Sequence, residues 1–427
     1  MLSTILYPEV ATWPSLLQRP VSDPTRLFDQ VRKIMEEVKA GGDAAVRRLT
    51  KEFDGATLDD FSINQQTVAA AAEEISVELL QAIRQAASNI RQFHTPQLRQ
   101  EDPIETMPGI TCWRRSRPIE KVGLYIPGGT APLFSTILML GIPAQLAGCK
   151  EVILCTPPGK DGKVHPAILV AAAEVGIQQI FTIGGVQAIA AMTYGTETVP
   201  AVYKIFGPGN QYVTAAKQLA QQEGIAIDMP AGPSEVCVWA DASAHPEFVA
   251  ADLLSQAEHG ADSQVLLVTT DDSLPAKVEK AVQQQLAILP RADYARQAFH
   301  NSKAIIVKDQ QDALALVNAY APEHLIIACE EAELLGEKVI NAGSVFLGNY
   351  SPESVGDYAS GTNHTLPTNG FARAYSGVSV DSFVKKITYQ RLTREGLTSL
   401  APTVVEMALA EGLQAHARAV EIRLQPK

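Results

Sequence analysis

Cysteine is scarce in this chain, with five among 427 residues. The cysteines stand singly among apolar neighbours, which is neither a disulfide framework nor the C-x-x-C spacing of a metal or redox site. We therefore expect reduced thiols in the core. Cys155, within the apolar run EVILCTPP, is predicted to lie in a buried strand rather than to act as a nucleophile. No serine stands in a G-x-S-x-G motif either.

Positive charge is also in short supply. The net charge is -12 and no basic run appears, which argues against a nucleic-acid-binding surface. The longest stretch without a charged residue, 122–149, is interrupted by glycine and proline at Gly128, Pro132 and Gly141, so it favours a buried strand, turn and helix over a membrane helix. The first residues have neither the basic region nor the cleavage site of a signal peptide. The cytoplasm is the expected location.

Regular apolar patterns predict an α/β protein of more than one domain, since 427 residues exceed what one core usually accommodates. The opening reads as helical: a helix begins at Asp23-Pro24 and ends at Gly41-Gly42, another begins at Asp43, and a long amphipathic helix covers about 65–93. From Lys121 onward, apolar runs alternate with helical patterns. The runs are VGLYI, EVILC, QIFTI, VYKIF and AIDM, then VCVWA, QVLLVTT, AIIV, HLIIA and SVFLG.

This alternation is typical of parallel sheets with helices on their faces. We predict two Rossmann-like parallel-sheet domains, as from a duplicated unit, with a helical N-terminal segment and a small C-terminal tail domain. From about Phe383 the sequence becomes KKITYQRL and then helical to the end. This tail has too little apolar surface for a core of its own, so it is expected to pack on another domain or another chain.

Glycine gathers at the expected carboxyl ends of the first set of strands, where open parallel sheets bind ligands. The segments are IPGG (126–129), IGGVQ (183–187) and GPGN (207–210). Such loops let the backbone approach a phosphate, and the helix that follows adds a favourable dipole. None has the G-x-G-x-x-G spacing, so a nucleotide site and ordinary tight turns both remain open.

Two pairs of polar side chains are candidates for a metal site and for an acid–base pair. Gln256 and His259 stand three apart on what reads as the last turns of a helix ending at Gly260, a spacing that puts both on one face. They form half of a metal site or are two surface residues. Glu323 and His324 open the run HLIIA, where a strand would hold an acid–base pair rigidly, unless the pair is simply exposed.

Two further clusters could complete such a site. Asp357 and His364 lie in a segment rich in Gly, Ser, Thr and Asn, predicted to be a loop. Glu411 and His416 are five apart, and Gly412 between them could bend a helix and bring them together. Glutamine, histidine and aspartate form a set of N and O donors suited to zinc or another divalent ion.

The chain resembles the histidinol dehydrogenase family over nearly its whole length. Seven segments match the motifs of the family in order: YIPGGTAPLFST, GPGNQYVT, DMPAGPSEV, LLSQAEHGADSQ, APEHL, SVGDYASGTNHTLPT and EGLQAHARAV. The resemblance implies oxidation of L-histidinol to L-histidine, the last step of histidine biosynthesis, through a bound aldehyde. Two NAD molecules would be reduced in succession, and one Zn2+ per subunit would orient the substrate.

The resemblance also implies roles for individual residues. Glu323 and His324 match the catalytic acid–base pair, and the expected zinc ligands are Gln256, His259, Asp357 and His416. The substrate-binding positions would be Ser234, Gln256, His259, His324, Asp357, His364, Glu411 and His416. Tyr125, Gln187 and Asn210 match the positions that hold NAD, which agrees with the glycine-rich strand ends.

Two other classes of function fit the sequence less well. A sibling dehydrogenase of the same fold would oxidise another small alcohol, such as a sulfonated diol, but its substrate positions should then differ from Ser234, His364 and Glu411. A zinc-dependent hydrolase or a non-catalytic binding protein would leave the glycine-rich strand ends and the Glu323-His324 pair without a joint purpose.

The expected organisation follows from the resemblance and the patterns together. Residues 1–22 form an N-terminal arm, and residues 23–118 with 233–376 form a first α/β domain that carries the metal and catalytic residues. Residues 119–232 form a second α/β domain with the NAD-binding loops. Residues 377–427 form a helical tail that, in a homodimer, contributes to the site of the partner.

Overall fold

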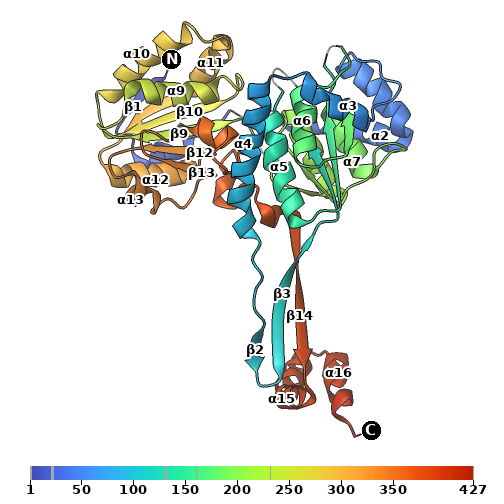
Figure 1. Cartoon of the computed structure of the whole chain (residues 1–427). Helices are drawn as coiled ribbons and strands as arrows, with labels where there is room; N and C mark the ends of the chain where they lie inside the picture. Colours follow the sequence, from blue (N-terminus) through green and yellow to red (C-terminus); the bar gives the residue numbers. More distant parts are fainter. Residues whose placement is uncertain (1, 21–23, 129–131, 160, 231, 427) are drawn as a thin grey trace.

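A computed structural model describes residues 2–20, 24–128, 132–159, 161–230 and 232–426. Two α/β bodies lie side by side, and a long antiparallel ribbon leads from them to a helical tail at the far end (Figure 1). In the described part of the chain no helix is long and apolar enough to cross a membrane. Cys155, Cys237 and Cys329 are buried and unpaired, whereas Cys112 and Cys149 are half-buried, so only the first three are core thiols.

The first parallel sheet has five strands, in the order β6-β5-β4-β7-β8. The strands are β4 (Lys121–Tyr125), β5 (Glu151–Thr156), β6 (Gln179–Thr182), β7 (Lys204–Phe206) and β8 (Ala226–Ile227). Helices α5 (Phe134–Ala147), α6 (Pro166–Glu174), α7 (Gly185–Tyr194) and α8 (Gln211–Gln222) connect them. In chain order the arrangement is third, second, first, fourth, fifth, so the strand order reverses between β4 and β7.

The second sheet has six parallel strands, in the order β1-β11-β10-β9-β12-β13. The strands are β1 (Ser3–Leu6), β9 (Glu235–Ala240), β10 (Gln264–Thr269), β11 (Lys303–Ile306), β12 (His324–Ala328) and β13 (Ser344–Leu347). Its helices are α9 (Pro246–Ala257), α10 (Leu274–Leu286), α11 (Ala292–Ala298), α12 (Gln310–Tyr320), α13 (Ala332–Gly336) and α14 (Glu353–Tyr358). Without β1, its topology equals that of the first sheet, while an origin by duplication stays a prediction.

All ten predicted strands are present, and most are apolar runs buried within a parallel sheet, whereas the edge strand β13 alternates half-buried and exposed residues. In β9, for example, Val236 and Val238 belong to the core on one face of the six-stranded sheet, whereas Cys237 and Trp239 belong to the core on the other. The expectation of an entirely helical opening is wrong at β1, which pairs with β11. A short helix, α1 (Trp13–Leu16), follows it.

The N-terminal helices cover the five-stranded sheet. Helix α2 (Pro24–Phe53) breaks at Gly42 (φ 52), near the predicted boundary, although Asp23 lies outside the described residues. The single helix predicted over 65–93 is wrong: α3 (Gln65–Ala70) ends early, and α4 (Val77–His94) begins anew because the Ser76 side chain accepts a hydrogen bond from Leu79 N.

The packing of these helices differs from the expected division of the chain, which grouped 23–118 with 233–376. Helix α2 contacts α7 and α8, and α4 contacts α5. The reason is the burial of apolar side chains. Val31 and Met35 of α2 share a core with Ile189, and Ile83 of α4 shares a core with Ile137. Residues 24–94 therefore pack with 119–232.

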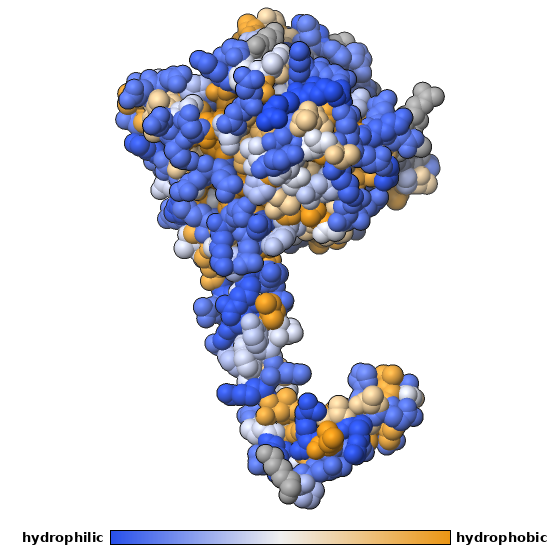
Figure 2. Space-filling view, turned by 90° about the vertical axis from the view of Figure 1, so that its right-hand side faces the viewer, coloured by the Kyte–Doolittle hydropathy of each residue, from blue (hydrophilic) through white to orange (hydrophobic). Residues whose placement is uncertain are grey.

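The tail is not entirely helical, contrary to expectation. Strand β14 (Val384–Leu392) pairs antiparallel with β3 (Ile110–Pro118), which also pairs with β2 (Ile104–Met107). The rings of Trp113 and Tyr389 stack across this ribbon. Helices α15 (Arg394–Ala410) and α16 (Gln414–Leu424) follow at its far end, away from both sheets (Figures 1 and 2).

Candidate active site

The predicted acid–base pair lies at the amino edge of the six-stranded sheet. Glu323 immediately precedes β12 and His324 is its first residue, between β9 and β13. Both residues are buried, with 7% and 3% of their surface exposed, so the alternative of simple surface residues is wrong. Ser234 directly precedes the neighbouring strand β9 and is half-buried.

Burial and neighbouring carboxylates perturb this pair. Glu323 Oε2 accepts a hydrogen bond from Glu235 N at 2.9 Å, and burial raises the pKa of Glu323 to about 8. Burial alone would lower the pKa of His324, but the carboxylates of Glu323, Asp357 and Glu353 outweigh it and raise this pKa to about 10. His324 Nε2 lies 3.5 Å from Asp357 Oδ1. Such coupled, shifted groups are typical of catalytic sites.

Gln256 presents a buried oxygen that the described residues leave without a hydrogen-bond partner. Its Nε2 donates to Glu353 Oε1 at 2.7 Å. Because a carboxylate only accepts, the amide nitrogen must face Glu353, and Oε1 must face away from it. The unpartnered oxygen is suited to a metal ligand, since buried polar atoms are otherwise paired.

The prediction that this helix ends at Gly260 is wrong. Helix α9 ends at Ala257, and Glu258 follows in a right-handed conformation as the C-cap. His259 lies in the turn beyond, where its N–H donates to Gln256 O at 3.2 Å. As a residue His259 is exposed, yet protein atoms around the ring lower its pKa, and the Asp357 carboxylate partly offsets this effect. The turn thus keeps His259 within reach of the Asp357 charge.

Asp357 lies on the short helix α14 rather than in a loop, one turn after Glu353. His324, Glu353 and Asp357 each offer a ligand atom within 4.8 Å of the others, a separation at which a metal ion could be shared. Burial alone would raise the pKa of Asp357, but the His324 imidazole holds it well below its usual range. Sequence reasoning missed Glu353, although its spacing of four from Asp357 places both on one helix face.

His364 lies in the expected loop and joins the two α/β bodies. Its Nδ1 is 2.7 Å from Asp357 O, and its Nε2 is 2.9 Å from Thr136 Oγ1 on α5. Directly before His364, Asn363 Nδ2 donates to Met139 O of that helix at 2.6 Å. The acid–base pair of the six-stranded sheet therefore faces elements of the five-stranded sheet.

The three predicted NAD-binding residues lie at the carboxyl edge of the five-stranded sheet. Tyr125 ends β4, and its hydroxyl accepts a hydrogen bond from Gly185 N at 3.1 Å. Gln187, buried in α7, donates from Nε2 to Asp54 Oδ2 at 3.1 Å. Asn210 caps α8 by accepting from the N–H groups of residues 212 and 213. This edge includes β4 and β7, between which the strand order reverses, the usual ligand position in such sheets.

A buried ion pair braces the loop after β7. Lys217 contacts Asp228, and both side chains are almost completely buried. Lys217 Nζ donates to Gly207 O at 2.8 Å, and Asp228 Oδ2 accepts from Gly207 N at 2.8 Å. Gly207 has φ 130, and a Cβ there would lie 1.9 Å from Tyr125 O, so only glycine fits. Of the glycine-rich segments, Gly129 lies outside the described residues.

Two of the predicted site residues, Glu411 and His416, do not lie near the other site residues of the same chain. Both are exposed, at the end of α15 and in α16 of the distant tail (Figure 1). Gly412 (φ 73) does separate the two helices, as expected. Within a single chain the tail helices therefore do not complete the cluster around Asp357.

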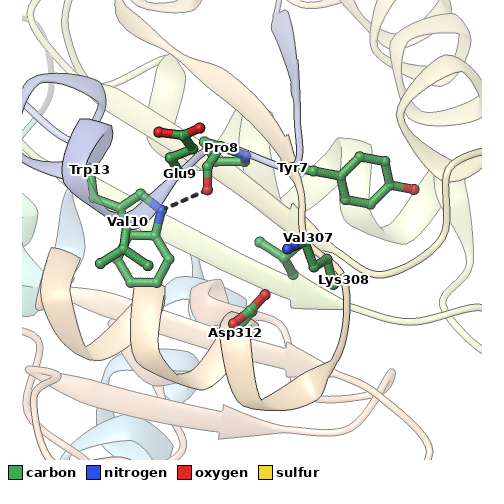
Figure 3. A pocket seen from close by; sticks show the side chains of 8 residues that line it. All are labelled: Tyr7, Pro8, Glu9, Val10, Trp13, Val307, Lys308 and Asp312. Carbon is green, nitrogen blue, oxygen red and sulfur yellow. Dashed lines mark hydrogen bonds between the residues drawn. The ribbon is translucent and has the colours of Figure 1, made fainter.

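A hollow of about 140 Å³ opens elsewhere, beside the carboxyl ends of β1 and β11. Its lining residues, drawn in Figure 3, are Tyr7, Pro8, Glu9, Val10, Trp13, Val307, Lys308 and Asp312. None of them is a predicted site residue. Trp13 Nε1 donates to Pro8 O at 3.3 Å within the N-terminal arm (Figure 3), and the Trp13 side chain is buried in the core on one face of the six-stranded sheet.

Comparisons with known proteins agree with this arrangement. The family model described as histidinol dehydrogenase matches residues 17–424. Histidinol dehydrogenases from Bacteroides fragilis (strain YCH46) and Bacteroides thetaiotaomicron are 57% and 58% identical over 424 residues, 99% of this chain and of each relative. The crystal structure of histidinol dehydrogenase from Elizabethkingia anophelis has a TM-score of 0.97 and 56% identity, covering 99% of this chain and 98% of that one. The chain belongs to the histidinol dehydrogenase family of oxidoreductases.

Proposed function

We propose that this chain catalyses the NAD-dependent four-electron oxidation of L-histidinol to L-histidine through bound L-histidinaldehyde, with a zinc ion orienting the substrate. The observation that carries the proposal is the buried Glu323-His324 pair beside Asp357 and the unpartnered Gln256 Oε1. A base (His324), a carboxyl group (Glu323) and a set of metal donors thus lie together, as two successive oxidations require.

The donor set fits zinc. Gln256 and Asp357 offer oxygen atoms and His259 a ring nitrogen, and no thiolate is involved. His416 of a second copy would supply the fourth ligand. Zinc, when bound, would hold the imidazole and amine of histidinol and so fix the position of its alcohol. The bridging His364 and the half-buried Ser234 would contact the substrate, together with Glu411 of the second copy.

The acid–base pair would act in turn. In the first oxidation His324 would take the proton of the alcohol, and NAD, when bound, would supply the hydride acceptor. In the second, Glu323 would take a proton from the attacking water, and His324 would give its proton to the aldehyde oxygen, which forms a hydrate and leaves His324 neutral. His324 would then remove a hydroxyl proton of the hydrate as hydride passes to a second NAD, and the product is the carboxylic acid.

NAD would bind at the carboxyl edge of the five-stranded sheet, near Tyr125, Gln187 and Asn210. The support is threefold: the reversal of strand order between β4 and β7, the glycine after β7 that permits close backbone approach, and the capped N-terminus of α8. The contact between His364 and Thr136 of α5 supports a substrate position within reach of this edge.

A homodimer would complete the site. The tail helices expose apolar side chains, namely Met407, Leu409, Leu413 and Ile422, and they stand clear of the body of their own chain (Figure 2). Apolar residues grouped on a projecting element favour burial against another surface. A two-fold dimer would let each tail carry Glu411 and His416 to the site of its partner.

A turnover assay tests the function. NAD reduction with histidinol, in an approximate ratio of two NADH per histidine, is the expected result, and chelation should abolish it until zinc or manganese is restored. NAD reduction with another small alcohol but not with histidinol would favour a sibling dehydrogenase. Full activity after exhaustive metal removal would contradict the metal site.

A further inference from the structure

The backbone of one residue, Glu235, contacts both members of the acid–base pair. Its N–H donates to Glu323 Oε2 at 2.9 Å, and its carbonyl oxygen lies 3.1 Å from His324 Nδ1. The same Nδ1 lies 3.3 Å from Gln256 Nε2, so the Glu235 carbonyl and the Gln256 amide together fix the place of the ring. The position of Glu235 therefore sets the orientation of both the Glu323 carboxyl group and the His324 imidazole.

The side chain of Glu235 is held in turn by Arg19 of the N-terminal arm. Arg19 Nε lies 2.5 Å from Oε1 and Nη2 lies 2.8 Å from Oε2, a bidentate contact. Glu235 is only 2% exposed, and Oε1 also accepts from Asn369 N at 2.7 Å. A buried carboxylate needs such partners, and the planar guanidinium allows one relative orientation.

The same guanidinium reaches the segment that leads into the pair. Arg19 Nη2 donates to Tyr320 O at 2.8 Å and to Ala321 O at 3.4 Å, and the group lies 4.2 Å from the centre of the Tyr320 ring. Ala321 has φ 54, a left-handed conformation that residues other than glycine rarely adopt. Such a conformation persists where the surroundings enforce it.

We propose that Arg19 is a positioning residue for the acid–base pair, acting through Glu235 and through the Tyr320 and Ala321 carbonyls. It ties the start of β9 to the turn before β12, the two neighbouring strands from which Glu235, Glu323 and His324 project. The proposal rests on the proposed function of Glu323 and His324 and adds to it a residue distant in the sequence that acts through the groups it holds in place.

Steady-state kinetics of the zinc-loaded full-length enzyme test the proposal. Arg19→Lys keeps the charge but loses the bidentate geometry, and Glu235→Gln keeps the size but loses the charge. Each should lower kcat for histidinol about 10- to 100-fold, the loss typical of a misplaced catalytic group, while KM for NAD and the zinc content stay within about twofold. Trp13→Phe is the matched control, because it removes an anchor of the same arm without touching Glu235, and its kcat should equal that of wild type.

Chemical rescue separates positioning from folding. In Arg19→Ala, added methylguanidinium should restore part of kcat, whereas methylammonium should not, because only the planar fork can make both contacts. Wild-type kcat in Arg19→Lys and Glu235→Gln would overturn the proposal, and so would an equal loss in Trp13→Phe. If Arg19→Ala does not fold, the other two variants decide the question.

Failure of the proposed function can be distinguished from failure of the positioning role. If the wild-type enzyme itself reduces no NAD with histidinol, the proposed function fails. The positioning role is then read from crystal structures of wild type and Arg19→Lys. A Glu235 carbonyl beyond hydrogen-bond distance of His324 Nδ1 in the variant would support the role, and an unchanged distance would overturn it.

Discussion

The zinc affinity of the proposed site should depend on Glu353, a residue that would not itself bind the metal. Gln256 Nε2 donates to Glu353 Oε1 at 2.7 Å, and both residues are 1% exposed. This bond turns the unpartnered Gln256 Oε1 away from Glu353 and toward the proposed ligand position. Replacing Glu353 by alanine should therefore leave the amide freer to rotate, with only the 3.3 Å contact to His324 Nδ1 remaining for its nitrogen.

The magnitude follows from the type of bond. A buried hydrogen bond to a charged group contributes about 1.5–3 kcal/mol. Loss of a residue that orients a metal ligand typically lowers metal affinity about 10- to 100-fold, and this corresponds to about 1.4–2.8 kcal/mol. The two ranges overlap, so we expect Glu353→Ala to bind zinc about 10- to 100-fold more weakly than wild type.

Competition between the metal-free protein and a chromophoric chelator measures this affinity directly. Ser255→Ala is the control, since Ser255 Oγ donates to Glu353 Oε2 at 2.8 Å but makes no hydrogen bond with the side chain of Gln256. Glu353→Gln should lose much less than Glu353→Ala, because its amide oxygen still accepts from Gln256. Wild-type affinity in Glu353→Ala would refute the orienting role. A loss in Glu353→Gln as large as in Asp357→Asn would make Glu353 a ligand instead.

Three further predictions concern the pair, the NAD loop and the tail. His324→Ala should lower histidinol oxidation by about 10²–10⁴, whereas Glu323→Gln should mainly impair histidinaldehyde oxidation; the opposite pattern would reverse their roles. Lys217→Met leaves Asp228 as a buried unpaired charge, so it should cost about 3–5 kcal/mol of stability and raise KM for NAD, and an unchanged melting temperature would contradict this. Mixing inactive His324→Ala and His416→Ala homodimers should restore up to about half of the activity, because one site then collects both lesions; no recovery after proven exchange would mean that the tail serves its own chain.

Local sequence was enough to predict the strands of both parallel sheets except β1. Each is a short apolar run such as EVILC or HLIIA, and a strand buried on both faces needs little information beyond that run. The order of site motifs along the chain was likewise enough to identify the family and to name Glu323, His324, Gln256 and Asp357 as candidates. The sequence left the burial of Glu323 and His324 open, and the place of β12 between β9 and β13 decided it.

Local sequence was less reliable at the ends of elements. Apolar residues recur at helical spacing on both sides of the break before α4. The break depends on one capping residue, Ser76. Helix α9 stops before His259 without a left-handed glycine. Glu353 lies outside the quoted motifs, and its contact with Gln256, 97 residues away, is a tertiary one.

Long-range packing decided the rest. Which sheet the N-terminal helices cover depends on side chains far apart in the sequence, such as Met35 and Ile189. The ribbon pairs β3 with β14, which starts more than 250 residues later, so the sequence does not show that these two strands pair. Arg19 reaches Glu235 across 216 positions. The sequence alone determined which residues have the chemistry, because that depends on residue type and motif; only the tertiary structure decided which residues hold them in place, because those contacts depend on how distant segments pack.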